Sequence, residues 1–222
     1  MAGEVTPVIR VLLADDDPLV RSGLKMMLRG AGDIEVVGEV EDGSGVAAAV
    51  RRHMPDVVLM DIRMPVMDGI AATRALTGQD SAAQVIVLTT FGTERLVVEA
   101  VRAGAAGYLL KHTEPEQIVL ALRSAARGEP VLSPAAARAL IDHTAAGSGT
   151  RAEHAARQFA LLSERERDVA VAVAEGLSNA EIGARLHLSA GTVKAHLSSA
   201  LAKLGLDNRV QLALLAHDAN PG

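Results

Sequence analysis

The chain of 222 residues contains no cysteine. Disulfide bonds and thiolate metal sites are therefore excluded, and this composition suits a reducing cytoplasm. Residues 1–7 lack the basic and apolar regions of a signal peptide, and no uncharged apolar run approaches the roughly 18 residues that span a membrane. We expect a soluble, cytoplasmic protein with no membrane partner. Because 49% of the residues are hydrophobic, a packed core is expected over most of the length.

The chain also lacks a strongly basic segment. Its net charge is −5; residues 1–128 carry 13 Lys or Arg against 17 Asp or Glu, and residues 159–222 carry 6 against 7. Tight, non-specific binding to DNA needs clustered positive charge. The charge distribution therefore weighs against that mode of binding.

The first 127 residues alternate short apolar runs with segments of helical period. The predicted strands are Ile9–Ala14, Ile34–Val40, Val57–Met60, Gln84–Thr89 and Gly107–Leu110. The predicted helices lie near Pro18–Arg29, Ser44–His53, Ile70–Thr77, Glu94–Ala103 and Glu116–Arg127. This alternation predicts right-handed crossovers and a flavodoxin-like, doubly wound α/β domain with five parallel strands over residues 1–127.

An all-α domain is predicted to follow, over residues 161–222. Its helices are Glu164–Ala174, Asn179–Leu186, Ala190–Leu204 and Arg209–His217. Residues 128–160 are predicted to link the two domains, with a helix near 134–143 that begins at Ser133-Pro134. The Gly/Ser-rich residues 144–150 are typical of a flexible linker, and residues 151–160 could extend a helix or stay loose.

Three capping boxes predict helix starts. They pair a Ser or Thr with a Glu three residues later: Thr113 with Glu116, Ser163 with Glu166, and Ser178 with Glu181. In such a box each side chain accepts a hydrogen bond from the other residue's backbone N–H.

Asp61 is the most informative acidic residue, because it ends the apolar run of a strand that should be buried on both faces. Alone it could be a helix cap or a solvated loop residue. However, Asp15 and Asp16 follow the first strand, and the carboxyl ends of parallel strands share one edge of the sheet. Asp17 is expected to cap the helix that Pro18 begins. Three converging carboxylates require a cation, and oxygen ligands favour Mg²⁺.

Two further strand ends add matching chemistry. Thr89 ends the fourth strand and Lys111 follows the fifth. A lone Thr is usually a strand former, and a lone Lys is usually solvated. Gathered at one edge with the acids, they fit phosphoryl transfer to Asp61, with Lys111 neutralising charge on the transferred group and Thr89 donating a hydrogen bond to it.

These motifs strongly resemble the receiver domain of bacterial two-component response regulators. The resemblance covers about residues 8–127 and includes Met64-Pro65, Asp68-Gly69 and Gly107-Tyr108. It implies that Asp61 accepts a phosphoryl group from a sensor histidine kinase. It also implies that Asp16, Asp61 and the backbone carbonyl of Arg63 bind Mg²⁺, with Asp15 assisting through water. Thr89 and Tyr108 correspond to a switch pair; without the resemblance, Tyr108 could equally be a core residue.

The segment Asn179–Leu204 is a helix-turn-helix candidate. On its second helix, Val193, Leu197, Leu201 and Leu204 form a core stripe. The opposite face has small residues, Gly191, Ala195, Ser198, Ser199 and Ala202, with Lys194 on one flank and Thr192, His196 and Lys203 on the other. Such a face can approach a major groove, although an ordinary amphipathic helix would show the same pattern.

Residues 161–217 resemble the LuxR-type DNA-binding domain, and the domain order resembles the NarL/FixJ class. This implies that Lys194, Ala195 and Ser198 occupy base-contacting positions, and that Arg209–His217 pairs DNA-bound domains. Ser198, Ser199 and Asp207 stand where relatives often carry basic residues. We therefore expect weak binding by the monomer and reliance on a homodimer.

Three functions compete. The first is a regulator of transcription whose phosphorylation at Asp61 promotes dimerisation and binding to promoter DNA. The second is a regulator of the same fold that is controlled by a ligand or partner, independently of phosphorylation. The third is a phosphatase with an Asp nucleophile, but such enzymes usually carry a second Asp where this chain has Arg63. We therefore predict that the protein is not an enzyme.

Overall fold

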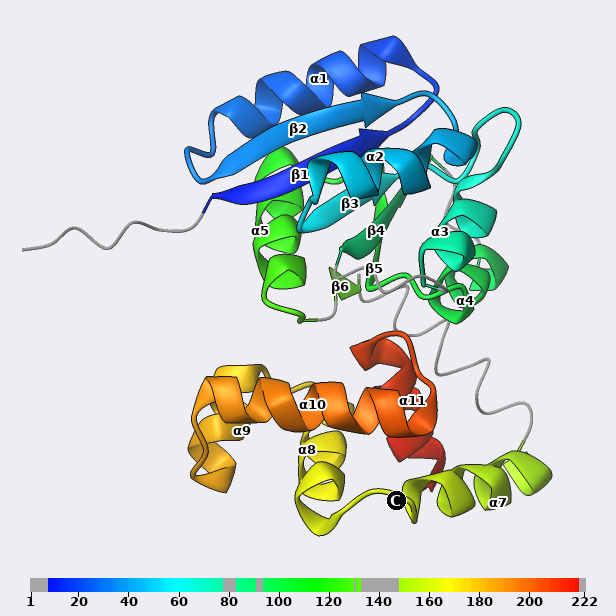
Figure 1. The fold of residues 1–222 in the computed structure, drawn as a ribbon, viewed down its shortest axis with the longest axis vertical. Helices are drawn as coiled ribbons and strands as arrows, with labels where there is room; N and C mark the ends of the chain where they lie inside the picture. The colour runs from blue at the N-terminus through cyan, green and yellow to red at the C-terminus, as the bar shows by residue number, and fades with distance from the viewer. Residues whose placement is uncertain (1–7, 78–82, 91–93, 130, 133–147, 220–222) are drawn as a thin grey trace, which may run out of the picture. The chain divides into compact units, whose positions relative to one another are not determined.

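The computed structural model describes residues 8–77, 83–90, 94–129, 131–132 and 148–219. The chain divides into two compact units, residues 1–136 and residues 137–222. Figure 1 shows a sheet with helices in the first unit and helices in the second. The predicted α/β domain followed by an all-α domain is confirmed.

The first unit is built on a parallel sheet with strand order β2-β1-β3-β4-β5-β6. Its strands are β1 (Ile9–Ala14), β2 (Ile34–Val40), β3 (Val57–Met60), β4 (Gln84–Thr89), β5 (Gly107–Leu110) and β6 (Val131–Leu132). The first five coincide with the predicted strands. The short sixth strand was not predicted, because two residues carry too little apolar period to be recognised. It pairs with β5 through Gly107 and Tyr108.

Helices cover both faces of this sheet (Figure 1). They are α1 (Pro18–Arg29), α2 (Val46–His53), α3 (Gly69–Thr77), α4 (Glu94–Arg102) and α5 (Pro115–Ala126), with a short 3₁₀ turn at Gly43–Gly45. One apolar core joins α1 and α5 to the sheet, and a second joins α2 and α3 to its other face. Because both faces are covered, β3 has no exposed residue and its sequence is apolar throughout.

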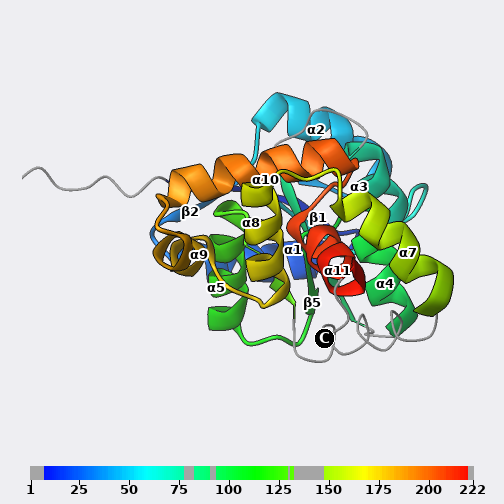
Figure 2. The same cartoon turned by 90° about the horizontal axis from the view of Figure 1, so that it is seen from below.

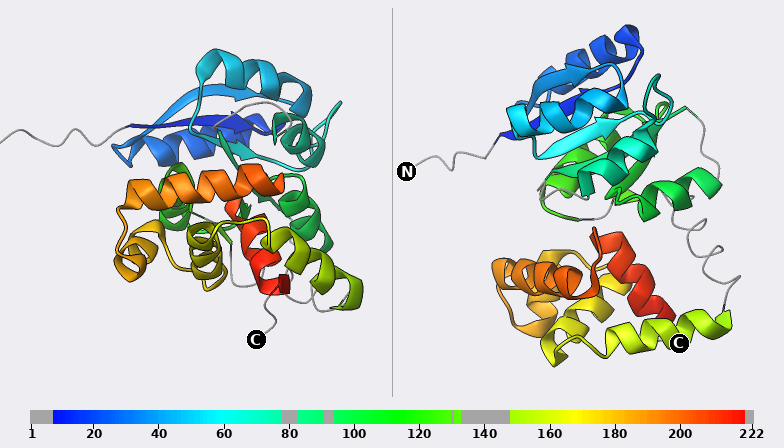
Figure 3. Two further views of the ribbon diagram at one scale, coloured as in Figure 1. Left: turned by 60° about the horizontal axis from the view of Figure 1, so that its bottom comes forward. Right: turned by 45° about the vertical axis from the view of Figure 1, so that its right-hand side comes forward.

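The second unit contains α7 (Ser148–Phe159), α8 (Glu164–Ala174), α9 (Asn179–Leu186), α10 (Ala190–Leu204) and α11 (Arg209–Ala219). Figures 2 and 3 show α10 as its long helix and α7 lying against α11. Phe159 at the end of α7 is buried in the same core as Val169, Ile182 and Leu197. The core of this unit therefore begins before the predicted helix Glu164–Ala174.

Several sequence predictions need correction at helix ends. Helix α2 begins at Val46, after the 3₁₀ turn, rather than at Ser44. Residues 148–150, predicted to be flexible, begin α7. The helix expected near 134–143 and residues 144–147 lie outside the described residues.

Two of the three capping boxes are confirmed and one is wrong. Ser163 with Glu166 and Ser178 with Glu181 each make both reciprocal hydrogen bonds. Thr113 does not cap α5: the N-cap is Glu114, without a side-chain hydrogen bond, and Pro115 takes the first helical position. Proline is well suited to that position, because its fixed φ fits the helix and it needs no acceptor, so it sets the start of α5.

Within the part of the chain that the structure describes, no helix has both the length and the apolar character needed to cross a membrane.

Candidate functional site

The parallel sheet brings the predicted acidic residues to one edge. Strands β1 and β3 are neighbours in register, with Ala14 opposite Met60. The backbone N–H of Asp61 continues this ladder by donating to the Ala14 carbonyl at 2.7 Å, and the N–H of Asp15 donates to the Val40 carbonyl at 3.2 Å. Asp15 and Asp61 are therefore held by the sheet itself, side by side at its carboxyl edge.

Lys111 joins these two acids. Its Nζ lies 2.7 Å from Asp15 Oδ2 and 2.8 Å from Asp61 Oδ2. The side chains of Asp15 and Asp61 are 3% and 7% exposed, so the ammonium meets two largely buried carboxylates. Lys111 follows β5, and the contact therefore ties together the ends of three strands. Buried charges require such partners, because an isolated ion loses its hydration.

Burial and the ion pairs act in opposite directions on the titration of these groups. Burial raises the pKa of the Asp61 carboxyl above its ordinary value, although the hydrogen bond from Lys111 opposes it. Burial lowers the pKa of Lys111, but the hydrogen bonds to Asp15 and Asp61 outweigh burial, and the net pKa of Lys111 is raised. Lys111 therefore stays an ammonium at neutral pH.

The three carboxylates fit a divalent cation. Asp15, Asp16 and Asp61 offer oxygens that all lie within 4.8 Å of one another, and Asp16 is exposed, which leaves the group open to solvent. One ammonium leaves these three carboxylates with excess negative charge, and an oxygen-only donor set suits Mg²⁺. Arg63 is exposed in the loop that follows Asp61, and the participation of its carbonyl stays a prediction.

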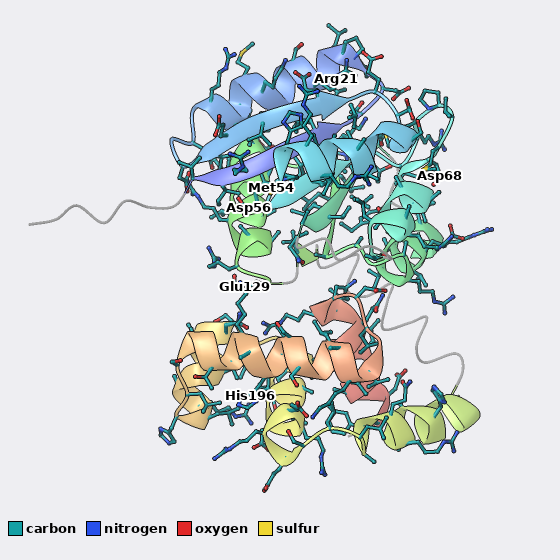
Figure 4. The ribbon with its side chains drawn as sticks, viewed as in Figure 1. Arg21, Met54, Asp56, Asp68, Glu129 and His196 are labelled. Atoms are coloured by element: carbon teal, nitrogen blue, oxygen red, sulfur yellow. The ribbon has the colours of Figure 1, made fainter. Side chains whose placement is uncertain are left out.

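The loop after Asp61 is shaped by a close backbone approach. The N–H of Gly69 donates to the Ile62 carbonyl at 2.9 Å, and Asp68 Oδ1 accepts from the Ala71 N–H at 2.7 Å. A Cβ on Gly69 would lie 1.9 Å from the backbone oxygen of Asp61. The Asp68-Gly69 pair thus allows the start of α3 to contact the backbone of Asp61. Figure 4 labels Asp68 at this helix start.

Thr89 and Tyr108 lie on the same face of the sheet. Thr89 is opposite Leu110 and Val87 is opposite Tyr108, so the two residues are diagonal neighbours on β4 and β5. Each is 2% exposed. Burial raises the pKa of the Tyr108 hydroxyl. Thr89 ends its strand, and the switch role of Thr89 and Tyr108 stays a prediction.

The second unit contains the predicted helix-turn-helix. Helix α9 ends at Leu186, and its C-cap residue, His187, has a left-handed backbone with φ of 57°. The N–H of Leu188 donates to the Gly183 carbonyl, and a Cβ on Gly183 would lie 2.6 Å from the Leu188 oxygen. Ser189 then caps α10 by accepting from the Thr192 N–H at 3.1 Å. The turn is tight because residue 183 has no side chain.

The exposed face of α10 carries most of the residues predicted to bind DNA. Val193, Leu197 and Leu204 are buried, as the core stripe requires. Thr192, Lys194, Ala195, Ser198 and Lys203 are exposed, and His196 and Ser199 are half-buried. The Thr192 hydroxyl hydrogen-bonds the Ser189 hydroxyl at 2.8 Å.

Ser199 and Lys203 are engaged within the unit. The Ser199 hydroxyl donates to Glu166 Oε1 and Lys203 Nζ donates to Glu166 Oε2, each at 2.7 Å. Glu166 also accepts from the backbone N–H of Ser163 at 2.8 Å as part of its capping box. The Lys203 ammonium, then the Ser199 hydroxyl, lower the pKa of Glu166 to about 2. The capping box was predicted from the sequence, but the bonds from Glu166 to α10 were not, because no local pattern signals them.

Two family models match the chain. Residues 11–123 match the response regulator receiver domain, and residues 160–216 match the luxR family of bacterial regulatory proteins. The chain belongs to the response regulators. It combines a receiver domain with a LuxR-type DNA-binding domain, as transcriptional response regulators of two-component systems do.

Full-length relatives of this response regulator support the assignment. It is 41% identical to an uncharacterized transcriptional regulatory protein, YxjL of Bacillus subtilis, over 94% of each chain. It is 37% identical to the nitrate/nitrite response regulator NarL of Escherichia coli K12, over 93% of this chain and 94% of NarL. These relatives are regulators of transcription, and they agree with the NarL class that the sequence resembles.

Solved structures give the same family. The response regulator ChrA of a heme-sensing two-component system is 38% identical, with a TM-score of 0.53 over 95% of this chain and 96% of ChrA. The receiver domain of a NarL regulator from Mycobacterium tuberculosis is 36% identical, with a TM-score of 0.54 over 55% of this chain and 99% of that domain.

Replacing glycine by alanine usually stabilises a helix, but the close approach at Gly69 predicts the opposite effect there. Gly69→Ala should destabilise the first unit by about 2 kcal/mol or more, because the new Cβ collides with the Asp61 backbone. Gly23→Ala on α1 is the matched control: no atom lies within 4 Å of its Cβ, so it should stabilise by about 0.5–1 kcal/mol. Urea unfolding of both variants tests this, and a stabilised Gly69→Ala would contradict it.

The low pKa of Glu166 predicts an acid-sensitive second unit. A carboxyl with a folded pKa of about 2 and an ordinary value of 4.5 stabilises the fold above pH 4.5, and this stabilisation is lost as the pH falls toward 2. Glu166→Gln should therefore cost on the order of 2 kcal/mol at pH 6, and the difference from wild type should shrink by pH 3.

Glu181 provides the control for this measurement, because it forms the same kind of capping box with Ser178. Urea unfolding at both pH values should show a smaller loss for Glu181→Gln. Equal losses for the two variants would mean that the bonds to Ser199 and Lys203 add nothing to the box.

Proposed function

We propose that this response regulator accepts a phosphoryl group on Asp61 and thereby controls its binding to promoter DNA. The observation that supports this most directly is the contact of Lys111 with both Asp15 and Asp61. It gathers a nucleophilic carboxylate, an ammonium and further acids at one open edge of the sheet. A sensor histidine kinase is the donor that the family implies.

In the proposed step, a carboxylate oxygen of Asp61 attacks the phosphorus of a phosphohistidine. The new O–P bond forms as the P–N bond breaks, and the imidazole leaves with the bonding electrons and takes up a proton. Lys111 neutralises charge on the phosphoryl oxygens, and the Thr89 hydroxyl donates to one of them. The 2.8 Å contact between Lys111 Nζ and Asp61 Oδ2 supports this step, because the ammonium already lies beside the attacking carboxylate.

Mg²⁺ bound at the acids would neutralise further charge on the transferred group. Asp16, Asp61 and the Arg63 carbonyl would hold it, with Asp15 assisting through water. The carboxylate oxygens within 4.8 Å of one another support this assignment.

The effect of phosphorylation would pass from the acidic site to the rest of the protein through Thr89 and Tyr108. The Thr89 hydroxyl would be drawn toward the phosphoryl group. This movement would change the space available to Tyr108, which lies in the same layer of side chains, and the surface of the receiver domain would change as a result. The two residues would thus bias a two-state equilibrium toward a homodimer. Two recognition helices, one from each α10, would then lie on paired half-sites of a promoter.

On α10, Lys194, Ala195 and Ser198 are the proposed base contacts, and Thr192 and His196 lie beside them. All but the half-buried His196 are exposed. Ser199 and Lys203 are the weaker candidates, because their bonds to Glu166 would compete with contacts to DNA.

Phosphorylation is tested with acetyl phosphate and Mg²⁺. The mass of the wild type should rise by one phosphoryl group, located on Asp61 by peptide mapping, while Asp61→Ala should gain none. Phosphorylated wild type should bind promoter fragments more tightly and elute as a dimer. Equal binding with and without phosphate would instead favour the alternative, a regulator controlled independently of phosphorylation.

The DNA contact is tested with Lys194→Ala in the full-length, phosphorylated protein. Loss of this proposed base contact should weaken promoter binding by roughly tenfold and relax the preference for the base pair that it reads. Arg52→Ala removes an exposed charge from α2 of the receiver domain and should change neither quantity. An unchanged affinity for Lys194→Ala would remove this residue from the interface.

A further inference from the structure

Arg21 is a buried cation next to the acidic pocket that the proposed chemistry does not use. It lies on α1, where Figure 4 labels it, and is 8% exposed. An arginine this buried needs a partner for its charge and for its N–H groups. Its three guanidinium nitrogens all have partners, and these partners suggest what the residue does.

The shortest of the three bonds goes to the pocket. Nη1 of Arg21 donates to the backbone carbonyl of Asp15 at 2.6 Å, and this hydrogen bond is buried. That carbonyl belongs to the peptide unit that joins Asp15 to Asp16. Rotation of this peptide would turn the Asp16 backbone, and with it the exposed carboxylate, relative to Asp15. Arg21 therefore restrains the geometry between two of the three clustered acids.

The other two nitrogens anchor the guanidinium to β2 and the residues after it. Nε lies 3.3 Å from Glu39 Oε2, and Nη2 lies 3.2 Å from Glu41 Oε1. Glu39 is held in turn by Lys25, whose Nζ is 2.6 Å from Oε1. The side chain thus connects α1, the end of β2 and the loop after β1.

This anchoring matters because Asp15 is the last residue after β1 whose backbone N–H hydrogen-bonds to the neighbouring strand. The N–H of Asp15 makes a ladder bond to the Val40 carbonyl, and the next restraint is local, from the Asp17 N–H to Asp15 Oδ1 at 3.0 Å. The peptide between Asp15 and Asp16 lies between these two bonds. The carbonyl of that peptide is held by Arg21, not by the sheet.

Charge alone does not account for the arrangement. Glu39 and Glu41 place two carboxylates on the guanidinium, so its positive charge is largely compensated before it reaches the pocket. A planar guanidinium with donors in a fixed fork can bridge three acceptors, which a lysine ammonium at that position cannot match in geometry. The arrangement is therefore suited to orienting a peptide.

We propose that Arg21 is a positioning residue for the acidic pocket, because it fixes the peptide between Asp15 and Asp16 and thereby the two carboxylates as a cation site. This rests on the proposed Mg²⁺ site. Residues that orient the ligands of a metal from behind commonly change its affinity by tenfold or more when they are replaced.

The test is a calorimetric titration of the full-length protein with Mg²⁺. Arg21→Lys keeps the charge and removes the fork, and should weaken Mg²⁺ binding by roughly tenfold. Lys25→Gln is the matched control: it removes a partner of Glu39 but leaves the bond from Arg21 to Asp15, and its affinity should stay within about twofold of wild type. Thermal melts without Mg²⁺ report the stability of each variant separately.

The outcomes separate this inference from the proposed function. If wild type and Arg21→Lys bind Mg²⁺ equally well, the positioning role is wrong and the proposed site stands. If Lys25→Gln weakens binding as much as Arg21→Lys, general loosening of α1 explains the effect and the inference also fails. If wild type binds no Mg²⁺, both fail.

A second variant covers the case in which Arg21→Lys does not fold. Glu41 is exposed, with 79% of its side chain accessible, so Glu41→Gln should preserve the fold while loosening one arm of the guanidinium. Mg²⁺ affinity should fall by more than the roughly twofold that is allowed for Lys25→Gln. An affinity equal to that of wild type would overturn the proposal.

Discussion

The receiver domain depends on one ammonium shared by two carboxylates. Lys111 reaches Asp15 and Asp61 from the end of β5, while the acids come from β1 and β3. The contact exists only because the strand order places β3 between β1 and β4, and β4 beside β5, with all carboxyl ends at one edge. Without the lysine, the two buried carboxylates would repel each other.

Close packing around this ion pair restricts the residues that surround it. A Cβ on Gly69 would collide with the Asp61 backbone. Gly69 is needed for space rather than for a special backbone angle. The same holds for Gly183 in the helix-turn-helix. Both units thus place a glycine where another backbone or side chain must come close to a functional segment.

The sequence predicted what depends on local period and on strand ends. Five strands and the acids at their ends could be recognised because buried parallel strands are continuous apolar runs. It did not predict the bonds of Arg21 to the Asp15 carbonyl or of Glu166 to Lys203, which join residues brought together only by packing. Two local sequence patterns also favour different starts for α5. The helix begins at Pro115, and the capping box expected from Thr113 does not form.

Among the described residues, two buried acidic centres, at Glu166 and at Asp15 with Asp61, show why one is a candidate reaction site and the other is not. Glu166 accepts from Ser163, Ser199 and Lys203, so both of its oxygens are used inside the unit and its charge is matched by one lysine. At the edge of the sheet, Asp15 and Asp61 share Lys111, and the third carboxylate of the cluster, Asp16, is open to solvent. A closed network stabilises a fold. Excess negative charge that is fixed in place and open to solvent suits a cation, and it surrounds Asp61, the proposed phosphoryl acceptor.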